Sequence, residues 1–416
     1  MPGTAIPRRT QVAIIGAGPA GLILGQLLHR HGVDNVILEA RNRAYVEARI
    51  RAGVLEQGTV DLLRQIGAGD RLGREALVHD SFELRVEGQR TIVDILKLAG
   101  APMTVYGQQE VVKDLIELRV DQQHQPLAFN ARAIRVDDST GDRPSVVYEL
   151  DGRTHTLGAD AVVAADGFHG IGRQCIPASI LRCYEREYPF AWLGVMAQVA
   201  PSSQHVIYSR HAEGLGMLSM RSPTLTRLYL QVAKDTGREQ WPDERIWKHL
   251  HRRLATHDGW TLNEGPIIEF SVAPIKAFVA EPMRHGRLFL AGDAAHIVPP
   301  TGAKGLNLAV RDVQVLAPAL TALITEKDGR LADRYSEQCL RHVWWAQYFS
   351  CWMTEMVHTS TDPVAERLAL AQLRTLIERP SAQATLAENY VGLASPTLTG
   401  PAALGSAAPD WVSRPL

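Results

Sequence analysis

A short apolar strand that runs directly into a glycine-rich turn and a helix constrains this chain more than any other feature. Residues 11–15 form a β-branched run, Gly16, Gly18 and Gly21 follow in the order G-x-G-x-x-G, and residues 22–31 have a helical pattern. The first glycine permits a tight turn, the second lets the backbone approach a pyrophosphate, and the third allows the helix to pack closely on the strand. The N-terminus of the helix would also attract phosphates. The segment therefore predicts a dinucleotide-binding βαβ unit, but it does not distinguish NAD from FAD.

An acidic residue follows the second predicted strand at the spacing expected of such a site. Residues 35–38 form this strand, and Glu39 comes about 20 residues beyond the loop, where its carboxylate can accept hydrogen bonds from ribose hydroxyls. A second glycine pattern, at 67–73, follows a helical pattern instead of a strand. It is therefore not expected to bind a nucleotide.

Two later strands end in acidic, glycine-containing turns that are expected to face the same crevice as Glu39. Residues 161–165 lead into Asp166, and residues 287–291 lead into Asp293. Ligands of open α/β sheets bind at the carboxyl ends of the strands, which is where both aspartates fall.

The residues after Asp293 suit a redox-active ring. Pro299 and Pro300 make a stiff connection, and the glycines between 302 and 305 lead flexibly into a helix predicted at 306–325. The free N–H groups and the positive dipole end of this helix would stabilise an electron-rich group, such as the pyrimidine edge of a reduced isoalloxazine. An ordinary strand and helix would explain the apolar residues, but not the Pro, Thr, Gly and Lys clustered between them.

Composition limits the class of protein further. The 416 residues allow two or three domains of roughly 150 residues each. The net charge of -1 argues against a nucleic-acid partner or an anionic membrane surface. Four cysteines without C-x-x-C spacing are expected to be free thiols in a reducing cytoplasm, and no metal site is expected. The sequence contains no apolar run of about 18 residues, so no membrane span is predicted. The tail 395–416 is expected to be disordered.

Residues 204–232 contain strand-like runs separated by Gly and Pro turns, and they predict an antiparallel sheet for substrate binding. Alternation puts Ser219 and Arg221 on one face of a strand, and Tyr229 on one face of the next strand. A guanidinium beside two hydroxyls is suited to a carboxylate, because arginine can donate two parallel hydrogen bonds. Cross-strand pairing of polar residues on a solvated face is the alternative.

The glycine loop and the two acidic turns, in this order and spacing, resemble the fingerprints of single-component FAD-dependent aromatic hydroxylases. Family-like stretches include RIRAGVLEQG at 49–58, TVYGQ at 104–108 and AENYVGL at 387–393. The resemblance implies an α/β fold with a Rossmann-like FAD-binding domain, an antiparallel-sheet substrate-binding domain and C-terminal helices. The expected boundaries are 1–180 and 275–330 for the two parts of the FAD-binding domain, 181–274 for the substrate-binding domain, and 331–394 for a helical interface region.

The resemblance also assigns residues to FAD. Glu39 would hold the adenosine ribose and Asp293 the ribityl chain. Arg49 and Arg51 lie two residues apart, so in an extended segment both could face a pyrophosphate. The full expected set, with Gln108 near the phosphate and ribose and Leu306 and Asn307 against the isoalloxazine, is Gly16, Gly18, Ala20, Gly21, Glu39, Arg49, Arg51, Gln108, Asp166, Asp293, Gly305, Leu306 and Asn307.

The activity that the resemblance implies is hydroxylation of 4-hydroxybenzoate at C3, with NAD(P)H and dioxygen, through a flavin C4a-hydroperoxide. Ser219, Arg221 and Tyr229 would bind the substrate carboxylate.

At the other end of the substrate, the resemblance gives Tyr208 the role of receiving the phenolic proton and Tyr390 that of relaying it. His79, titrating near neutral pH, would exchange this proton with solvent. The carbonyl of Pro300 would help to shape the ring pocket. Without the resemblance, each tyrosine is a half-buried side chain.

NAD(P)H is expected to bind transiently, since the chain has one dinucleotide loop. By resemblance, His169 and Arg173 are contacts. Lys276 stands where an arginine is common in relatives, and Arg41 or Arg43 could supply charge near a 2′-phosphate. NADPH is favoured, but NADH stays open.

Three other interpretations stay open. The substrate could be a different hydroxybenzoate, although paired tyrosines favour a para phenol. A flavin-dependent halogenase is disfavoured, because its W-x-W-x-I-P signature is absent from the sequence. A non-catalytic flavin-binding protein would have no use for the substrate residues. A homodimer is a further expectation, based on the aromatic-rich helical segment 335–356.

Overall fold

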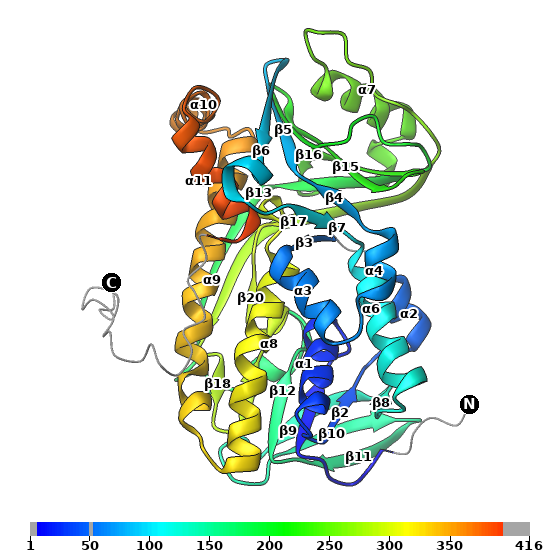
Figure 1. Cartoon of the computed structure of the whole chain (residues 1–416), viewed down its shortest axis with the longest axis vertical. Helices are drawn as coiled ribbons and strands as arrows, with labels where there is room; N and C mark the ends of the chain where they lie inside the picture. Colours follow the sequence, from blue (N-terminus) through cyan, green and yellow to red (C-terminus); the bar gives the residue numbers. More distant parts are fainter. Residues whose placement is uncertain (1–5, 50–52, 394–416) are drawn as a thin grey trace, which may run out of the picture.

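The computed structural model describes residues 6–49 and 53–393. Arg51 and the tail 395–416 lie outside the described residues. Two sheets of different construction occupy opposite ends of the molecule, and the long helix α9 (Arg330–Val357) runs beside α8 (Gly305–Thr321) between them (Figure 1). The predicted α/β class, with a Rossmann-like part, an antiparallel sheet and C-terminal helices, is confirmed.

The first sheet has six strands in the order β18-β19-β12-β1-β2-β8, and its central pairs are parallel. The central strands are wholly apolar, with sequences such as VAII and AVVA, and every residue in them is buried. Such runs are typical of parallel strands covered by helices on both faces. The bounds are β1 (Val12–Ile15), β2 (Asn35–Leu38), β8 (Leu127–Ala128), β12 (Ala161–Ala164), β18 (Arg284–His285), β19 (Leu288–Leu290) and, for the helix after β1, α1 (Pro19–Arg30).

The second sheet has eight strands in the order β20-β17-β13-β16-β15-β14-β5-β6. Polar and apolar side chains alternate along β16, so that Leu228 and Leu230 pack toward α7 while Tyr229 packs on the opposite face. The bounds are β5 (Ser81–Val86), β6 (Gln89–Asp94), β13 (Arg182–Ala197), β14 (Val206–His211), β15 (Gly214–Ser222), β16 (Leu225–Ala233), β17 (Ile267–Glu281), β20 (His296–Ile297) and α7 (Asp243–Leu254).

The expected domain boundaries differ from this topology at two places. Strands β5 and β6 come from the segment assigned to the FAD-binding part, but β5 pairs with β14 in the eight-stranded sheet. Strand β17 crosses the expected boundary at 274 and stays in this sheet to Glu281. Local patterning identifies a strand, but it does not identify a partner more than a hundred residues away.

Two smaller sheets and several helices complete the fold. Strands β3, β7 and β4 form one small sheet, and β11, β10 and β9 form another. The bounds are α2 (Arg43–Ala48), β3 (Val54–Glu56), α3 (Gln57–Gln65), α4 (Asp70–Glu75), β4 (Leu77–His79), α5 (Ile95–Ala99), β7 (Met103–Val105), α6 (Gln108–Ile116), β9 (Arg132–Asp137), β10 (Ser145–Leu150) and β11 (Arg153–Gly158).

The C-terminal helices close the molecule. Helix α10 (Pro363–Glu378) leads into α11 (Pro380–Val391), which packs against α5 and places Tyr390 in the core under the eight-stranded sheet. In the segment expected to form a dimer interface, Tyr335 and Phe349 are buried within the chain, and Trp345 and Trp352 are partly buried. Trp344 and Tyr348 are the large aromatic side chains of α9 that stay exposed, at 42% and 61%.

Helix Gly305–Glu326 is long and apolar enough to cross a membrane by composition, but 72% of its apolar window is buried inside the protein. It packs against α1 and α9 and is therefore a core helix of a globular fold.

Candidate active site

The glycine loop has the geometry that a pyrophosphate requires. Gly16 has a φ of +103°, and a Cβ there would lie 2.3 Å from the carbonyl oxygen of Ala165, so only glycine fits. A Cβ at Gly21 would lie 2.1 Å from the carbonyl oxygen of Gly16. Among the described residues, nothing lies within 4 Å of the place that a Cβ of Gly18 would take. Helix α1 begins at Pro19, where its first N–H groups can donate to phosphate oxygens.

Glu39 follows β2, and its carboxylate lies beside this loop. One oxygen accepts from the N–H of Ala17 at 2.8 Å and the other from the N–H of Arg41 at 2.9 Å. These bonds orient the carboxylate and leave further lone pairs for ribose hydroxyls. The role in ribose binding stays a prediction.

The segments of Arg49 and Gln108 lie close together. Arg49 is exposed after α2, and Gln108 is half-buried at the start of α6. Gly53 lies against the backbone of Tyr106, where a Cβ would be 2.3 Å from its carbonyl oxygen. The two segments can therefore approach one cofactor together.

One oxygen of the Asp166 carboxylate is bound within its own loop. Its backbone lies at the glycine loop, 3.1 Å from the place of a Gly16 Cβ. Its carboxylate, however, accepts from the N–H of Gly172 at 2.9 Å, and a Cβ at Gly170 would lie 2.0 Å from its Cγ. Burial raises the pKa of this carboxyl. Oδ2 therefore stabilises the loop of Asp166, whereas Oδ1 has no hydrogen-bond partner among the described residues, and the role of Asp166 in FAD binding stays a prediction.

The buried pair of Asp312 and His296, which sequence reasoning missed, supports the turn of Asp293 from the core side. Gly292 has a φ of +62°, and its N–H donates to Oδ2 of Asp312 at 2.8 Å. The same oxygen lies 2.7 Å from Nε2 of His296. Burial lowers the pKa of His296, but the Asp312 carboxylate more than offsets this, so the pKa is raised. The turn that would receive a ribityl chain is thus anchored in the core, next to Ala20 in the first turn of α1.

The start of α8 offers backbone donors. The first hydrogen bond of the helix runs from the N–H of Leu308 to the carbonyl of Lys304 at 2.8 Å. The N–H groups of Gly305, Leu306 and Asn307 precede it, and these are the groups that a helix cannot satisfy itself. They are suited to the oxygen and nitrogen acceptors of an isoalloxazine edge.

Both polar atoms of the Asn307 side chain form hydrogen bonds within the protein. Its Oδ1 accepts from the N–H of Glu56 at 2.9 Å and the hydroxyl of Thr59 at 2.8 Å. Its Nδ2 donates to the carbonyls of Val54 and Ala303 at 3.1 and 2.9 Å. Asn307 can therefore offer a flavin its backbone while its amide fixes the helix start on β3.

Tyr208 on β14 and Tyr390 on α11 meet in the core. Their hydroxyl oxygens lie 3.1 Å apart, and the hydroxyl of Tyr208 donates to the carbonyl of Thr301 at 3.2 Å. Phe82 packs against both rings. Burial raises the pKa of Tyr208 well above its usual value and that of Tyr390 to about 12. Both phenols are therefore protonated at neutral pH and can pass a proton between them.

Pro300 opens the short turn Pro300–Gly302 next to this pair. Its carbonyl accepts from the N–H of Ala303 at 3.0 Å. A carbonyl oxygen has two lone pairs, so it can still accept from a substrate hydroxyl. Its role in shaping the ring pocket stays a prediction.

His79 ends β4 opposite Met103, which belongs to the apolar cluster around the two tyrosines. The residue is 4% exposed, and neither ring nitrogen hydrogen-bonds to any described residue. Burial lowers its pKa to about 4, with His205 adding to the effect and Asp80 opposing it. The prediction that His79 titrates near neutral pH is therefore wrong for this conformation, because charging an unpartnered buried ring is unfavourable. A neutral imidazole can still accept and hand on a proton.

The buried histidines predict that acid destabilises the fold. Burial lowers the pKa of His79 and His342 to about 4 and that of His358 to about 3. The folded-state pKa lies below the unfolded one, so this stabilisation is complete above about pH 6.5 and is lost as the pH falls toward 4. We expect each histidine to lower the free energy of unfolding by about 1–2 kcal/mol between pH 7 and pH 5.

Urea unfolding of the wild type and of His79→Phe at pH 7 and pH 5 measures this effect. The variant should lose less stability on acidification. Equal losses in the two proteins would contradict the assignment of the low pKa to His79.

Two of the predicted carboxylate-binding residues, Ser219 and Tyr229, lie on one face of the eight-stranded sheet, and Arg221 lies at an irregularity of the strand pairing between Met220 and Ser222. The register of β15 and β16 puts Ser219 opposite Arg227 and Met217 opposite Tyr229. Arg221 is largely buried, and burial lowers its pKa while the Tyr229 phenol opposes this. The face shared by Ser219 and Tyr229 follows the predicted alternation, and Tyr229 packs against the core that holds Tyr208.

Three of the predicted NAD(P)H contacts gather around one ring. Nζ of Lys276 lies 3.2 Å from the ring centroid of Phe168, and the guanidinium of Arg173 lies 4.8 Å from it. His169 follows Phe168 in the chain and is exposed. Arg173 also donates to the carbonyl of Ala294 at 2.8 Å, which ties this loop to the turn of Asp293.

Arg41 comes from another segment, after β2. It is exposed, and its guanidinium lies 5.2 Å from the ring of Tyr45. Arg43 is instead paired with Glu47 at 2.6 Å and with Asp121 at 2.5 Å. Of the two arginines, Arg41 is therefore the better donor to a 2′-phosphate.

A buried ion pair joins β3 to the residue before α8, and sequence reasoning gave no sign of it. Nζ of Lys304 donates to Oε1 of Glu56 at 2.7 Å and to the carbonyl of Tyr390 at 2.8 Å. Lys304 is 1% exposed; burial lowers its pKa, and Glu56 opposes this. The partners are 248 residues apart, so no local pattern could reveal the pair.

The end of α11 is sensitive to substitution at Gly392. This glycine has a φ of +85°, and a Cβ there would lie 2.3 Å from Oε2 of Glu56. We expect Gly392→Ala to lower the free energy of unfolding by about 1–3 kcal/mol, because it adds strain and displaces a buried carboxylate.

Thermal unfolding checks this expectation against Gly73→Ala. Gly73 lies inside α4, and a Cβ there would meet nothing within 4 Å among the described residues. That variant should be as stable as the wild type or more stable. If Gly392→Ala unfolds at the same temperature as Gly73→Ala, the packing argument is refuted.

The fold and the nucleotide-binding elements define the class of protein. Residues 9–350 match the family described as an FAD binding domain. The fold is similar to the crystal structure of p-nitrophenol 4-monooxygenase PnpA from Pseudomonas putida DLL-E4, with a TM-score of 0.81, 20% identity, and coverage of 94% of this chain and 100% of that one. The chain belongs to the family of FAD-dependent aromatic hydroxylases.

Within this family, the chain is similar over nearly its whole length to one curated enzyme. It is 44% identical over 388 residues to p-hydroxybenzoate hydroxylase from Acinetobacter baylyi (strain ATCC 33305 / BD413 / ADP1), covering 92% of this chain and 96% of the relative. A probable NADH-specific resorcinol 4-hydroxylase from Rhodococcus jostii (strain RHA1) is 24% identical over 350 residues, 81% of this chain and 63% of that protein.

Proposed function

We propose that this enzyme hydroxylates 4-hydroxybenzoate at C3 to give 3,4-dihydroxybenzoate. One atom of dioxygen enters the ring, the other leaves as water, and NAD(P)H supplies two electrons. When bound, FAD carries these electrons and activates the oxygen. The observation that carries the proposal is the buried contact between the hydroxyls of Tyr208 and Tyr390, 3.1 Å apart, in the core faced by the Ser219 and Tyr229 strands.

The polar face of β15 and β16 recognises the carboxylate. Arg221 can donate two parallel hydrogen bonds to it, and the hydroxyls of Ser219 and Tyr229 can complete its acceptor sites. An analogue without a carboxylate would leave the mostly buried Arg221 without its anionic ligand. This cost favours aromatic acids over neutral phenols.

The tyrosine pair handles the phenol. The hydrogen bond between Tyr208 and Tyr390 can run in either direction. A substrate hydroxyl that donates to Tyr208 would turn the Tyr208 proton toward Tyr390, and the phenol would lose its proton along this line. The resulting phenolate releases electrons into the ring and activates the carbon ortho to it.

A substrate panel tests the proposal. NAD(P)H consumption, hydrogen peroxide and hydroxylated product are measured together for 4-hydroxybenzoate, 3-hydroxybenzoate, 3,4-dihydroxybenzoate and benzoate. We expect product to match coenzyme consumption for 4-hydroxybenzoate alone. Absence of 3,4-dihydroxybenzoate would refute the proposal.

For the coenzyme, we propose NADPH, with the exposed Arg41 meeting the 2′-phosphate. Arg41→Ala is expected to raise the KM for NADPH by about tenfold and to leave the KM for NADH nearly unchanged, because NADH lacks that phosphate. Steady-state assays with both coenzymes measure this. Arg8→Ala is the control, because Arg8 is also an exposed arginine but comes before β1, in another segment. Equal effects on both coenzymes would assign Arg41 another role.

We further propose that the enzyme acts as a cytoplasmic homodimer. Trp344 and Tyr348 on α9 and Tyr184 on β13 form an exposed aromatic patch, with Tyr184 at 43% and its ring 5.4 Å from that of Trp344. Light scattering of the wild type and of Tyr348→Glu would give the mass of each. A monomeric wild type would refute this part of the proposal.

A further inference from the structure

The residue that caps the C-terminus of α9 is a buried histidine whose hydrogen bonds determine its tautomer. Nε2 of His358 lies 2.6 Å from Nε1 of Trp192, and Nδ1 lies 2.7 Å from the carbonyl of Thr354. An indole N–H can only donate and a carbonyl can only accept, so Nε2 is the acceptor and Nδ1 carries the proton. The ring also stacks on Phe190 at 4.5 Å. His358 is therefore a neutral side chain held in one orientation.

This orientation reaches the carboxylate-binding face through Trp192. The indole, on β13, lies 4.8 Å from the ring of Tyr229 on the neighbouring strand β16. The hydrogen bond to His358 fixes the orientation of the indole, and the indole packs against the ring of Tyr229. A shift of the indole would move the tyrosine hydroxyl that faces the carboxylate.

One turn earlier on α9, Thr354 reaches the phenol-binding end. Its hydroxyl oxygen lies 2.9 Å from that of Thr301, and it also hydrogen-bonds to the carbonyl of Ser350 at 2.7 Å. The carbonyl of Thr301 accepts from the hydroxyl of Tyr208. The position of Tyr208 thus depends on the short turn that Thr354 holds.

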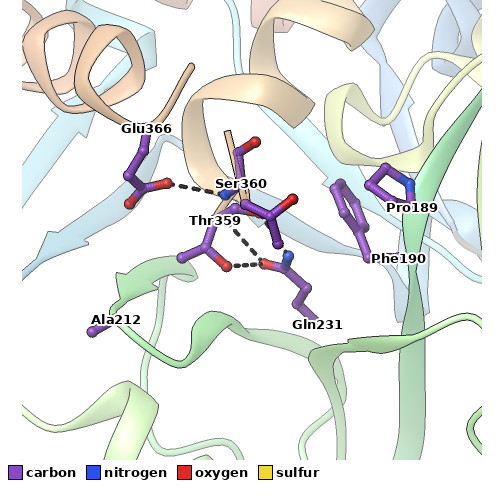
Figure 2. A pocket seen from close by; sticks show the side chains of 8 residues that line it. Pro189, Phe190, Ala212, Gln231, Thr359, Ser360 and Glu366 are labelled. Carbon is purple, nitrogen blue, oxygen red and sulfur yellow. Dashed lines mark hydrogen bonds between the residues drawn. The ribbon is translucent and has the colours of Figure 1, made fainter. Parts of the chain in front are cut away.

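The C-terminal end of α9 is hydrogen-bonded to the eight-stranded sheet. The amide nitrogen of Gln231, on β16, donates to the carbonyl of Thr359 at 2.9 Å. The amide oxygen of Gln231 accepts from the N–H of Thr359 at 3.0 Å (Figure 2). The guanidinium of Arg210, on β14, donates to the carbonyls of Met356 and His358. The end of α9 is therefore fixed to the same strands that carry Tyr208 and Tyr229.

We propose that His358 and Thr354 are positioning residues for the two ends of the substrate. His358 sets Tyr229, at the carboxylate end, through Trp192. Thr354 sets Tyr208, at the phenol end, through Thr301. The inference rests on the proposed function, because it takes the roles of the two tyrosines from it.

The holoenzyme tests the His358 part with ligands that carry one or both ends. Dissociation constants of 4-hydroxybenzoate and of benzoate are measured from the absorbance change of bound flavin. In His358→Phe, which keeps the stacking ring but loses both hydrogen bonds, both acids should bind on the order of tenfold more weakly. His358→Gln can donate and accept, so it should recover much of this affinity. Binding unchanged in His358→Phe, or equal losses in the two variants, would overturn this part.

Thr354→Val tests the other end, because valine keeps the shape and removes the hydroxyl. Benzoate should bind as in the wild type, whereas the ratio of product to NAD(P)H consumed should fall several-fold with 4-hydroxybenzoate. The matched control is Thr375→Val on α10, where the hydroxyl also donates to a carbonyl four residues earlier, at 2.9 Å, but is exposed. A Thr354→Val protein that behaves like this control would overturn this part.

Two further measurements separate the possible failures. Wild type that forms no 3,4-dihydroxybenzoate refutes the proposed function, whatever the variants do. If His358→Phe does not fold, Trp192→Phe removes the indole donor from the other side. It should weaken the binding of both acids in the same way, and unchanged binding would overturn the His358 part.

Discussion

Replacing Tyr208 by phenylalanine is expected to leave 4-hydroxybenzoate bound while most of the NAD(P)H consumed yields hydrogen peroxide instead of product. The variant loses the hydroxyl that meets Tyr390 at 3.1 Å, and with it the path by which the phenol can lose its proton. Positioned proton transfer contributes about 10²–10⁴-fold to rates. We therefore expect product formation to fall by about 10²-fold or more. The dissociation constant of the substrate should change much less, because the carboxylate contacts remain.

Rapid quantification of product, peroxide and coenzyme in one reaction measures this split. Tyr148→Phe is the control: Tyr148 is a buried tyrosine on β10 of a separate small sheet, and its ring stacks on His155. It should keep wild-type coupling. If Tyr208→Phe converts as much NAD(P)H into 3,4-dihydroxybenzoate as the wild type does, the relay assigned to the pair is refuted.

Replacing Arg221 by lysine is expected to weaken 4-hydroxybenzoate binding by about 10²-fold. Lysine keeps the charge but presents a single ammonium, so it cannot donate the two parallel hydrogen bonds of a guanidinium. It is also more strongly hydrated, and the site is mostly buried, so part of its charge would stay uncompensated. Coupling should change less than affinity, because the tyrosine pair is intact.

Ligand truncation makes this prediction specific to the carboxylate. Phenol, which has no carboxylate, should bind Arg221→Lys and wild type equally. Arg252→Lys serves as a control, because Arg252 is exposed and pairs with Glu213 at 2.5 Å, outside the site. Equal weakening for phenol and 4-hydroxybenzoate would show that Arg221 supports the fold and does not read the carboxylate.

Features that depend on neighbours in the chain could be predicted. The strand, glycine loop and first helix form as expected, because Gly16 must adopt a positive φ there and the apolar strand must be buried. The face shared by Ser219 and Tyr229 follows from the two-residue period of strands. The helix start at Gly305 follows from the proline and glycine residues before it.

Features that depend on burial or on distant partners could not be predicted. His79 was expected to titrate near neutral pH, but its pKa depends on how deeply β4 and its neighbours bury the ring. The bond from the N–H of Gly172 to Asp166 was not predicted, because it depends on the fold of the loop between them. The Lys304–Glu56 pair and the attachment of β5 to β14 join segments far apart in sequence.

The sequence by itself therefore determined the class of fold, the places where a dinucleotide and an aromatic acid are expected, and the family. Backbone geometry and side-chain alternation are local properties, and a local pattern encodes them. The tertiary structure alone decided that Tyr208 and Tyr390, 182 residues apart, touch, and that the end of α9 supports both ends of the site. The physical reason is that hydrogen-bond distances and desolvation exist only after the segments that supply both partners have packed together.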